Sequence, residues 1–150
     1  MQLIIFIGIQ AVGKSTFYKE RFFKTHVRIN LDMLRTRHRE ASLLKKCIEL
    51  KVPIVVDNTN PTGEDRKRYI PSAKRAGYKI IGYYFSSKIS QALHRNKSRV
   101  GKESIPEAGI RSTRRRLVIP SYDEGFDELY YVWIDREGNF VVEKWRDEIS

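Results

Sequence analysis

One short segment near the beginning of the chain restricts its possible folds more than any other feature. Residues 8–15 read Gly-Ile-Gln-Ala-Val-Gly-Lys-Ser and fit the pattern G-x-x-x-x-G-K-[ST]. A continuous apolar run at residues 3–7 precedes this segment, and a helical pattern begins at Lys14. Because a strand, a glycine-containing loop and a helix follow one another in this order, the segment predicts a phosphate-binding loop rather than an ordinary turn with a surface lysine.

The chemistry of such a loop assigns a role to several of its residues. Inward-facing backbone N–H groups form an anion site, and the following helix adds the positive end of its dipole. We predict that the Lys14 ammonium contacts the β- and γ-phosphates of ATP, and that the Ser15 hydroxyl is a ligand of Mg²⁺. The residues expected to contact the nucleotide are Gly8, Gln10, Ala11, Val12, Gly13, Lys14, Ser15 and Thr16.

The remainder of the chain alternates between apolar runs and helical patterns, which indicates an α/β fold. Strands are expected near residues 3–7, 27–29, 54–56, 78–85 and 129–134, followed by a hairpin that turns at Gly138. Helices are expected over residues 14–23, from 30 or 32 towards 50, over 62–76 with a disturbance at Pro71, over 89–99, and from Pro106 onward. We therefore predict a single domain, residues 1–150, with a mainly parallel five-stranded sheet. A lid over about residues 101–120 and a C-terminal hairpin over about 128–146 complete the prediction.

Composition limits the partners and the location of the chain. Its 29 Lys and Arg residues against 18 Asp and Glu give a net charge of +11, which attracts polyanions such as nucleic acid. The single cysteine, Cys47, excludes an internal disulfide and is compatible with the cytoplasm. No apolar stretch approaches the length that spans a bilayer, so we expect no membrane association.

Asp32 and Arg35 follow the second predicted strand. The carboxyl ends of parallel strands form the ligand crevice of an open sheet, and residues three apart share one face of a helix. Asp32 is therefore a candidate base for a substrate hydroxyl, and Arg35 is a candidate ligand of a substrate phosphate. Alternatively, Asp32 complements the helix dipole and Arg35 is simply solvated.

The third predicted strand ends in an acid, Asp57, as expected of a Walker B segment whose carboxylate acts on Mg²⁺. Asn58 and Asn60 come next and either contact the substrate or serve as turn residues. Further along, Arg111, Arg114 and Arg115 share one helical face. We predict that Arg111 and Arg115 stabilise the charge of the transferred phosphoryl group from the lid, although a solvated basic face is the alternative.

These residues together resemble the kinase module of 5′-hydroxyl polynucleotide kinases, within the P-loop kinase superfamily. The matching pieces include Gly13 to Phe17, Asn30 with Asp32 and Arg35, and the string from Val56 to Pro61. Further matches are Arg66, Tyr69 and Ile70, residues 73–77, Ile105-Pro106 and residues 124–126, so the resemblance covers most of the chain. Ala11 and Val12 depart from it, because the family loop is usually richer in Gly and Ser.

The resemblance implies a three-layer P-loop fold and an ATP- and Mg²⁺-dependent transfer to a nucleic-acid 5′-hydroxyl. It implies that Asp32 is the general base and that Arg35 grips the neighbouring 3′-phosphate of the acceptor. Arg111 and Arg115 fall in the lid region of the family. Two other functions stay open: a kinase for a small-molecule hydroxyl, and a nucleotide-binding regulatory module without catalysis. DNA or RNA ends are the expected partners, and the sequence leaves protein partners open.

Overall fold

A computed structural model of the chain describes residues 1–99, 101, 104–147 and 149. Its strands are β1 (Gln2–Ile7), β2 (Val27–Ile29), β3 (Ile54–Val56), β4 (Lys79–Phe85), β5 (Glu128–Ile134) and β6 (Phe140–Lys144). Its α-helices are α1 (Lys14–Arg21), α2 (Leu31–Leu34), α3 (Arg37–Leu50), α4 (Gly63–Arg66), α5 (Ile70–Arg75), α6 (Ile89–Lys97) and α7 (Glu107–Arg116), and Tyr122–Glu124 forms a short 3₁₀ helix, η2. Part of the predicted lid, residues 102 and 103, lies outside the described residues.

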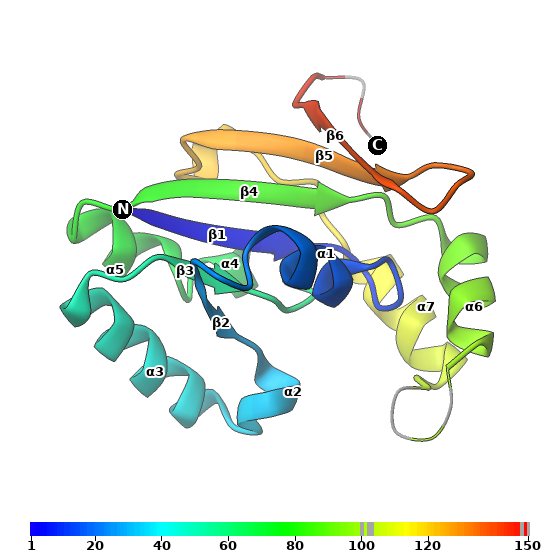
Figure 1. Cartoon of the computed structure of the whole chain (residues 1–150), viewed down its shortest axis with the longest axis horizontal. Helices are drawn as coiled ribbons and strands as arrows, with labels where there is room; N and C mark the ends of the chain where they lie inside the picture. The colour runs from blue at the N-terminus through cyan, green and yellow to red at the C-terminus, as the bar shows by residue number, and fades with distance from the viewer. Residues whose placement is uncertain (100, 102–103, 148, 150) are drawn as a thin grey trace.

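The strands form one sheet in the order β2-β3-β1-β4-β5-β6 (Figure 1). The first five of these are parallel to their neighbours, and only β6 runs antiparallel, beside β5. Five parallel strands and a terminal hairpin confirm the predicted α/β fold. Because β1 lies between β3 and β4, the segments that leave the carboxyl ends of β1 and β3 emerge side by side.

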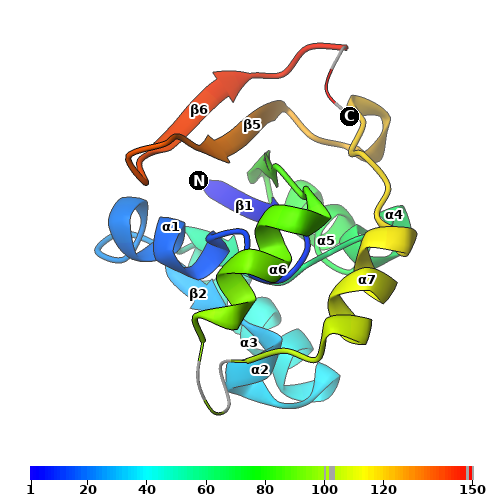
Figure 2. The ribbon, with the colours of Figure 1, turned by 90° about the vertical axis from the view of Figure 1, so that its right-hand side faces the viewer.

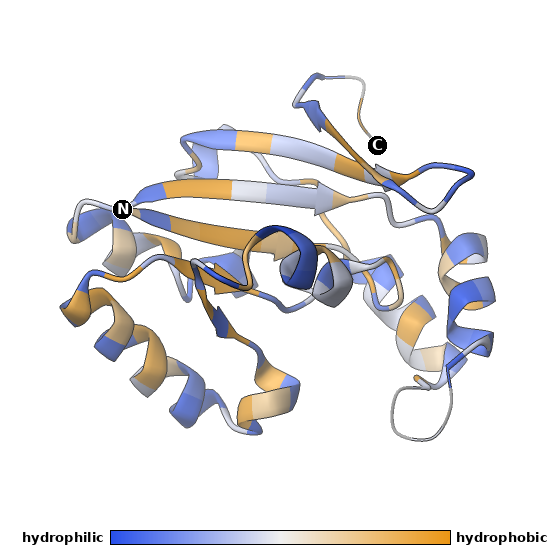
Figure 3. Cartoon of the chain, in the orientation of Figure 1, coloured by the Kyte–Doolittle hydropathy of each residue, from blue (hydrophilic) through white to orange (hydrophobic). Residues whose placement is uncertain are grey.

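Helices cover both faces of the sheet, which gives the three layers (Figures 1 and 2). Side chains alternate along β1, so Leu3, Ile5 and Ile7 pack on one face with residues of α3 and α5. Ile4 and Phe6 pack on the opposite face with residues of α1 and α6. Figure 3 shows the result, with hydrophobic strands in the middle and hydrophilic residues on the outer surfaces of the helices. Burial on both faces explains why β1 reads as an unbroken apolar run.

The long helix expected from residue 30 or 32 towards residue 50 is wrong, because the chain breaks at Arg35. The Asn30 side chain accepts a hydrogen bond from Met33 N at the start of α2, and α2 ends after Leu34. Arg35 has a φ of 78°, outside the helical region, and the Thr36 side chain then caps α3. The apolar spacing that predicted one helix continues through both, so it does not reveal the break.

The disturbance expected at Pro71 is present, although the helix is interrupted a few residues before the proline. The capping box that begins at Thr62 is present, with Thr62 and Asp65 bonded to each other's backbone. The helix is interrupted between Arg66 and Ile70, and Pro71 lies in the first turn of α5. Proline is accepted there because the first turn does not require its missing N–H. Within the described part of the chain, every helix is too short or too polar to cross a membrane.

Candidate active site

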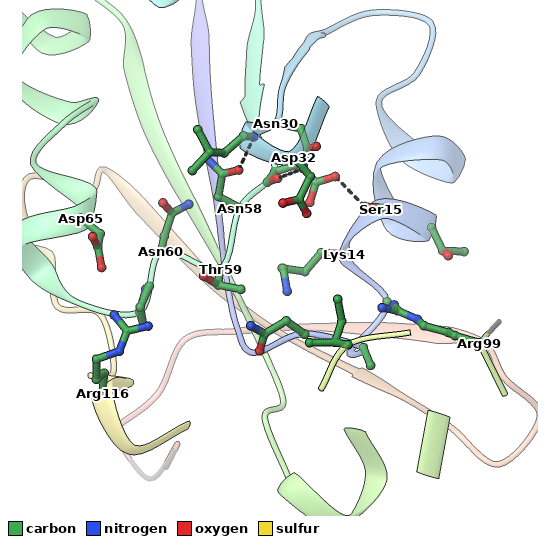
Figure 4. A pocket seen from close by; sticks show the side chains of 18 of the residues that line it. Lys14, Ser15, Asn30, Asp32, Asn58, Thr59, Asn60, Asp65, Arg99 and Arg116 are labelled. Carbon is green, nitrogen blue, oxygen red and sulfur yellow. Dashed lines mark hydrogen bonds between the residues drawn. The ribbon is translucent and has the colours of Figure 1, made fainter. Parts of the chain in front are cut away.

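A cavity of about 350 Å³ opens at the carboxyl ends of β1, β2 and β3 (Figure 4). Its walls come from the loop before α1, from the segments after β2 and β3, and from residues that flank α6 and α7. The lining residues are Gln10, Ala11, Gly13, Lys14, Ser15, Thr16, Asn30, Leu31, Asp32, Arg37, Asp57, Asn58, Thr59, Asn60, Pro61, Asp65, Arg99, Ile105 and Arg116. Most of the residues that we expected to contact the nucleotide therefore line this one cavity.

The loop before α1 has the backbone that its glycine pattern predicts. Gly13 has a φ of 93° and immediately precedes the first residue of α1, so the amino end of this helix faces the cavity. Ala11 has a φ of 61° and thus takes a left-handed conformation that glycine adopts more easily. Gly8 and Val12 belong to the loop but do not line the cavity: the Gly8 carbonyl accepts a bond from Lys14, and Val12 is buried in the core.

Lys14 lies in the middle of the site (Figure 4). Its ammonium donates hydrogen bonds to the carbonyl groups of Gly8 and Ile9 and is buried. Burial lowers its pKa to about 8, although the carboxylates of Asp57 and Asp32 act in the opposite direction. Arg99 reinforces the lowering, because its charge also acts on Lys14. A desolvated ammonium at the mouth of an anion-binding loop is suited to contact a phosphate.

Ser15 and Asp57 meet at the edge of the loop. Ser15 Oγ donates to Asp57 Oδ2 over 2.9 Å, and Asp57 is 2% exposed. Mg²⁺ prefers oxygen ligands and is held by one or two protein groups together with phosphates, so this pair fits the ion. Among the described residues, no group of three or more His, Cys, Asp or Glu gathers as a metal site. Ser15 and Asp57 would supply two oxygen ligands to the ion, and nucleotide phosphates would supply others.

Asp32 lines the cavity, but the predicted helical face shared with Arg35 is wrong. Arg35 ends α2 with a φ of 78° and is not among the residues that line the cavity. Arg37 lines it instead, at the start of α3. The sequence contained a signal that a new helix starts after Arg35, because Thr36 is a residue type typical of a helix N-cap. In the structure the Thr36 side chain accepts a bond from Arg39 N.

Arg37 is held by a buried polar network that sequence reasoning did not find. Glu40 is 2% exposed and accepts hydrogen bonds from Arg37 (2.8 Å), Asn58 (2.8 Å) and the Tyr69 hydroxyl (3.1 Å). Burial and the charge of Glu40 raise the pKa of Tyr69 to about 12, so its hydroxyl remains a donor. The Glu40 carboxylate thus joins α3 to the start of α5 and to the segment after β3, and so fixes one edge of the cavity.

Asn58 and Asn60 line the cavity, yet their side chains are engaged with the protein. Asn58 Oδ1 accepts from Leu31 N, and its amide nitrogen donates to Glu40 and Tyr69. Asn60 is 3% exposed and donates to the carbonyl of Phe6. These bonds connect the segment after β3 to α2 and β1. A structural role explains both asparagines, and contact with a substrate stays a prediction.

The arginines that line the cavity near the predicted lid are not the two that we expected. Arg111 pairs with Glu107 on its own helix, and neither Arg111 nor Arg115 is among the described residues that line the cavity. Arg99 and Arg116 line it from opposite sides (Figure 4). Gln10 also connects the loop to the lid, since its amide donates to Thr113 Oγ1 on α7 over 3.0 Å. Helical spacing groups the arginines of α7 correctly, but it does not show which face turns towards the loop.

The comparison with known families agrees with this geometry. A family described as an AAA domain matches residues 3–120, which include the phosphate loop, Asp32, Asp57 and all of the predicted lid. The chain belongs to this family. Its fold is that of a P-loop kinase.

Two curated relatives are kinases that act on nucleic acid according to their names. The chain is 28% identical over 132 residues to the bifunctional polynucleotide phosphatase/kinase of Schizosaccharomyces pombe and is homologous to its kinase part. The alignment covers 85% of this chain but only 32% of the relative. The L-seryl-tRNA(Sec) kinase of Methanococcus maripaludis is 27% identical, with 83% of this chain and 56% of the relative covered. The chain thus spans about a third to a half of their lengths.

A solved structure supports the fold. Kti12 of Chaetomium thermophilum, determined in complex with ADP-AlF3, superimposes with a TM-score of 0.66 over 91% of this chain and 92% of its own. The sequences are 15% identical, so this likeness concerns the fold alone. It confirms the predicted P-loop architecture.

Proposed function

We propose that the chain transfers the γ-phosphate of ATP, bound with Mg²⁺, to the 5′-hydroxyl of a polynucleotide. The observation that carries the proposal is that Lys14 and Asp32 line one cavity, close enough for the carboxylate charge to act on the ammonium. A phosphate held by Lys14 would therefore lie next to a base for the incoming hydroxyl. Mg²⁺, held by Ser15 and Asp57, would neutralise charge on the β- and γ-phosphates.

The proposed step uses these residues in sequence. The acceptor oxygen attacks the γ-phosphorus while its proton passes to the Asp32 carboxylate. The bond between the γ-phosphorus and the β–γ bridging oxygen breaks, and ADP leaves with its phosphates held by the loop and Lys14. Arg99 lines the phosphate side of the cavity and is placed to stabilise the charge that develops. Arg111 and Arg115 stay proposed for the same role in a closed lid.

The acceptor is proposed from the relatives and from charge. The curated relatives act on polynucleotides or tRNA according to their names, and the net charge of +11 suits a polyanionic acceptor. Arg35 was expected to grip the acceptor phosphate, and we now add Arg37, because Glu40 holds it at the cavity edge. We also propose the cytoplasm as its location, in keeping with a single cysteine.

The direct test is label transfer. The protein is incubated with [γ-³²P]ATP, Mg²⁺ and matched DNA and RNA oligonucleotides that carry either a 5′-hydroxyl or a 5′-phosphate. Label is expected on the 5′-hydroxyl strands only. If neither DNA nor RNA with a free 5′-hydroxyl accepts label, the acceptor is wrong.

Replacement of Asp32 by Asn separates chemistry from nucleotide binding. Loss of a general base costs roughly 10²–10⁴-fold in turnover, whereas the neutral side chain keeps the shape of the site. We expect kcat to fall by that factor while ATP affinity, measured by calorimetry, stays within about threefold. A collapse of ATP affinity would make Asp32 structural. If the unmodified chain binds ATP but transfers nothing to any acceptor, it is a nucleotide-binding module.

A second candidate acceptor is a small hydroxyl compound, free or attached to tRNA. The relative named as an L-seryl-tRNA(Sec) kinase favours the attached form. Seryl-tRNA, free serine and an oligonucleotide are compared at equal concentration, with ADP production as the readout. Turnover with seryl-tRNA or serine, and none with the oligonucleotide, would replace the polynucleotide acceptor and leave the ATP site unchanged.

A further inference from the structure

Arg28 lies next to the proposed metal ligands, Ser15 and Asp57. Neither the motifs nor the family resemblance assigns a role to this arginine. It lies on β2, and its side chain is 27% exposed. Its Nε donates to Asp57 Oδ2 over 2.9 Å, and its Nη2 donates to Ser15 Oγ over 3.0 Å. The guanidinium thus contacts both oxygens that the proposed function gives to Mg²⁺, and the present inference rests on that metal role.

Because of these contacts, the Arg28 guanidinium and Mg²⁺ would compete for the same two oxygens. Mg²⁺ takes its ligands at about 2.0–2.1 Å in a near-octahedral shell, so it would compete with the guanidinium for lone pairs on the same oxygens, and the two positive charges would repel each other. Asp57 is 2% exposed, so its charge is poorly screened by water and its ion pair with Arg28 is strengthened. A metal that binds Ser15 and Asp57 is therefore expected to weaken or displace the bonds of Arg28 to them.

The Arg28 side chain also has a contact that involves neither Ser15 nor Asp57. The Arg28 guanidinium lies 5.8 Å from the centre of the Tyr18 ring, within the range of a cation–π contact. Tyr18 is itself fixed, because its hydroxyl donates to the carbonyl of His26. Arg28 can therefore release Ser15 and Asp57 without losing every partner.

We propose that Arg28 competes with Mg²⁺ for Ser15 and Asp57, and so makes metal binding depend on the nucleotide. A divalent ion alone must displace a cation from a buried carboxylate. A nucleoside triphosphate brings oxygen ligands and negative charge of its own, which shift the competition towards the metal. Arg28 thus weakens binding of the metal in the absence of ATP.

The test measures metal binding directly, with Mn²⁺ as the probe ion and electron paramagnetic resonance as the readout. Without nucleotide, Arg28→Gln is expected to bind Mn²⁺ about tenfold more tightly than the unmodified chain, which corresponds to one ion pair. Arg28→Lys keeps the charge but cannot bridge both oxygens, so it should tighten binding about threefold. Arg39→Gln removes an equal charge outside the cavity and should change nothing.

With a non-hydrolysable ATP analogue present, the difference between Arg28→Gln and the unmodified chain should shrink to within about twofold. Equal or weaker Mn²⁺ binding by Arg28→Gln without nucleotide would overturn the inference. If Arg28→Gln does not fold, as judged by its unfolding transition, Arg28→Lys decides in the same way.

Asp57→Asn distinguishes this inference from the proposed metal site. If Asp57→Asn leaves Mn²⁺ binding unchanged in the presence of the analogue, the metal role of Asp57 is wrong. If Asp57→Asn weakens that binding but Arg28→Gln does not tighten binding without nucleotide, only the competition by Arg28 is wrong.

Discussion

At the scale of single residues, the buried position of Lys14 favours phosphate binding at the expense of stability. Burial lowers its pKa from 10.5 to about 8, so the folded chain binds this proton less tightly than the unfolded chain. The unfolded state therefore holds more protons between these two values, and stability without nucleotide rises with pH across that window. Below about pH 8 Lys14 is charged in both states, so the full destabilisation of the folded state by the buried ammonium is present.

Lys14→Met should consequently raise the free energy of unfolding at pH 7 in the absence of nucleotide. We expect a gain of about 1–3 kcal/mol, because each pKa unit corresponds to ~1.4 kcal/mol and the lost hydrogen bonds offset part of it. Urea denaturation measures the gain, and calorimetry should show ATP binding abolished in the same variant. Lower stability of Lys14→Met would mean that its two carbonyl bonds outweigh desolvation.

The pKa of Lys14 also predicts how ATP binding depends on pH. A bound phosphate favours the charged ammonium and raises its pKa, so binding above about pH 8 must take up a proton. ATP affinity should therefore fall as the pH rises from 8 to 9.5. Calorimetry with a magnesium–nucleotide analogue, in two buffers of different ionisation enthalpy, should detect close to one proton at pH 9 and little uptake at pH 7. Equal uptake at both values would contradict this assignment.

Residues whose position depends on local pattern lie where the sequence predicts them. Gly13, Lys14 and Ser15 line the cavity as their motif requires, because adjacent residues define the turn and the helix start. Arg37, Glu40 and Arg99 were missed, because their positions depend on where α3 begins and on how α6 packs. The bonds of Asn58 and Asn60 are likewise long-range, to partners as distant in the chain as Phe6.

At the scale of elements, the C-terminal hairpin has a role that its sequence did not suggest. Phe140 on β6 packs against the phosphate loop: a Cβ added at Gly13 would lie 2.9 Å from the Phe140 ring. The same ring lies 5.1 Å from that of Phe17 on α1. The hairpin therefore supports the loop from behind. Strand pairing of residues 128–146 follows from alternation and the Gly138 turn, but the surface that β6 covers does not.

Phe140→Ala should weaken both the fold and the loop. Loss of a half-buried phenylalanine is expected to reduce the free energy of unfolding by about 1–3 kcal/mol. Because the cavity lies on the other side of Gly13, ATP affinity should also fall several-fold under conditions where the variant is fully folded. Val142→Ala on the same strand is the control, since Val142 is exposed and is not among the nearest neighbours of Gly13. A stability loss with unchanged ATP affinity would show that the hairpin does not shape the loop.

At the scale of the whole molecule, the sheet topology and the net charge concern different substrates: the topology forms the ATP site, and the charge concerns the acceptor. The parallel sheet places the loop, Asp32 and Asp57 at one edge, and that arrangement suits any P-loop kinase. The surplus of 11 positive charges is not needed for ATP alone, which Lys14 and the loop already accommodate. If the acceptor is a polynucleotide, the surplus should act on the acceptor rather than on the donor.

This difference predicts separate salt dependences for the two substrates. An acceptor strand whose phosphates contact about three cationic side chains should bind at least about tenfold more weakly at 200 mM than at 50 mM KCl, because counterion release sets the slope. Fluorescence anisotropy of a labelled 5′-hydroxyl decamer measures this slope, and a 5′-hydroxyl dinucleotide is the matched control with few phosphates. Arg37→Gln should reduce the slope of the decamer by about one charge, whereas Lys24→Gln should not, because Lys24 is exposed in the turn after α1 and does not line the cavity. A slope equal to that of the dinucleotide would mean that the basic surplus does not contact the acceptor, and would favour the small-hydroxyl alternative.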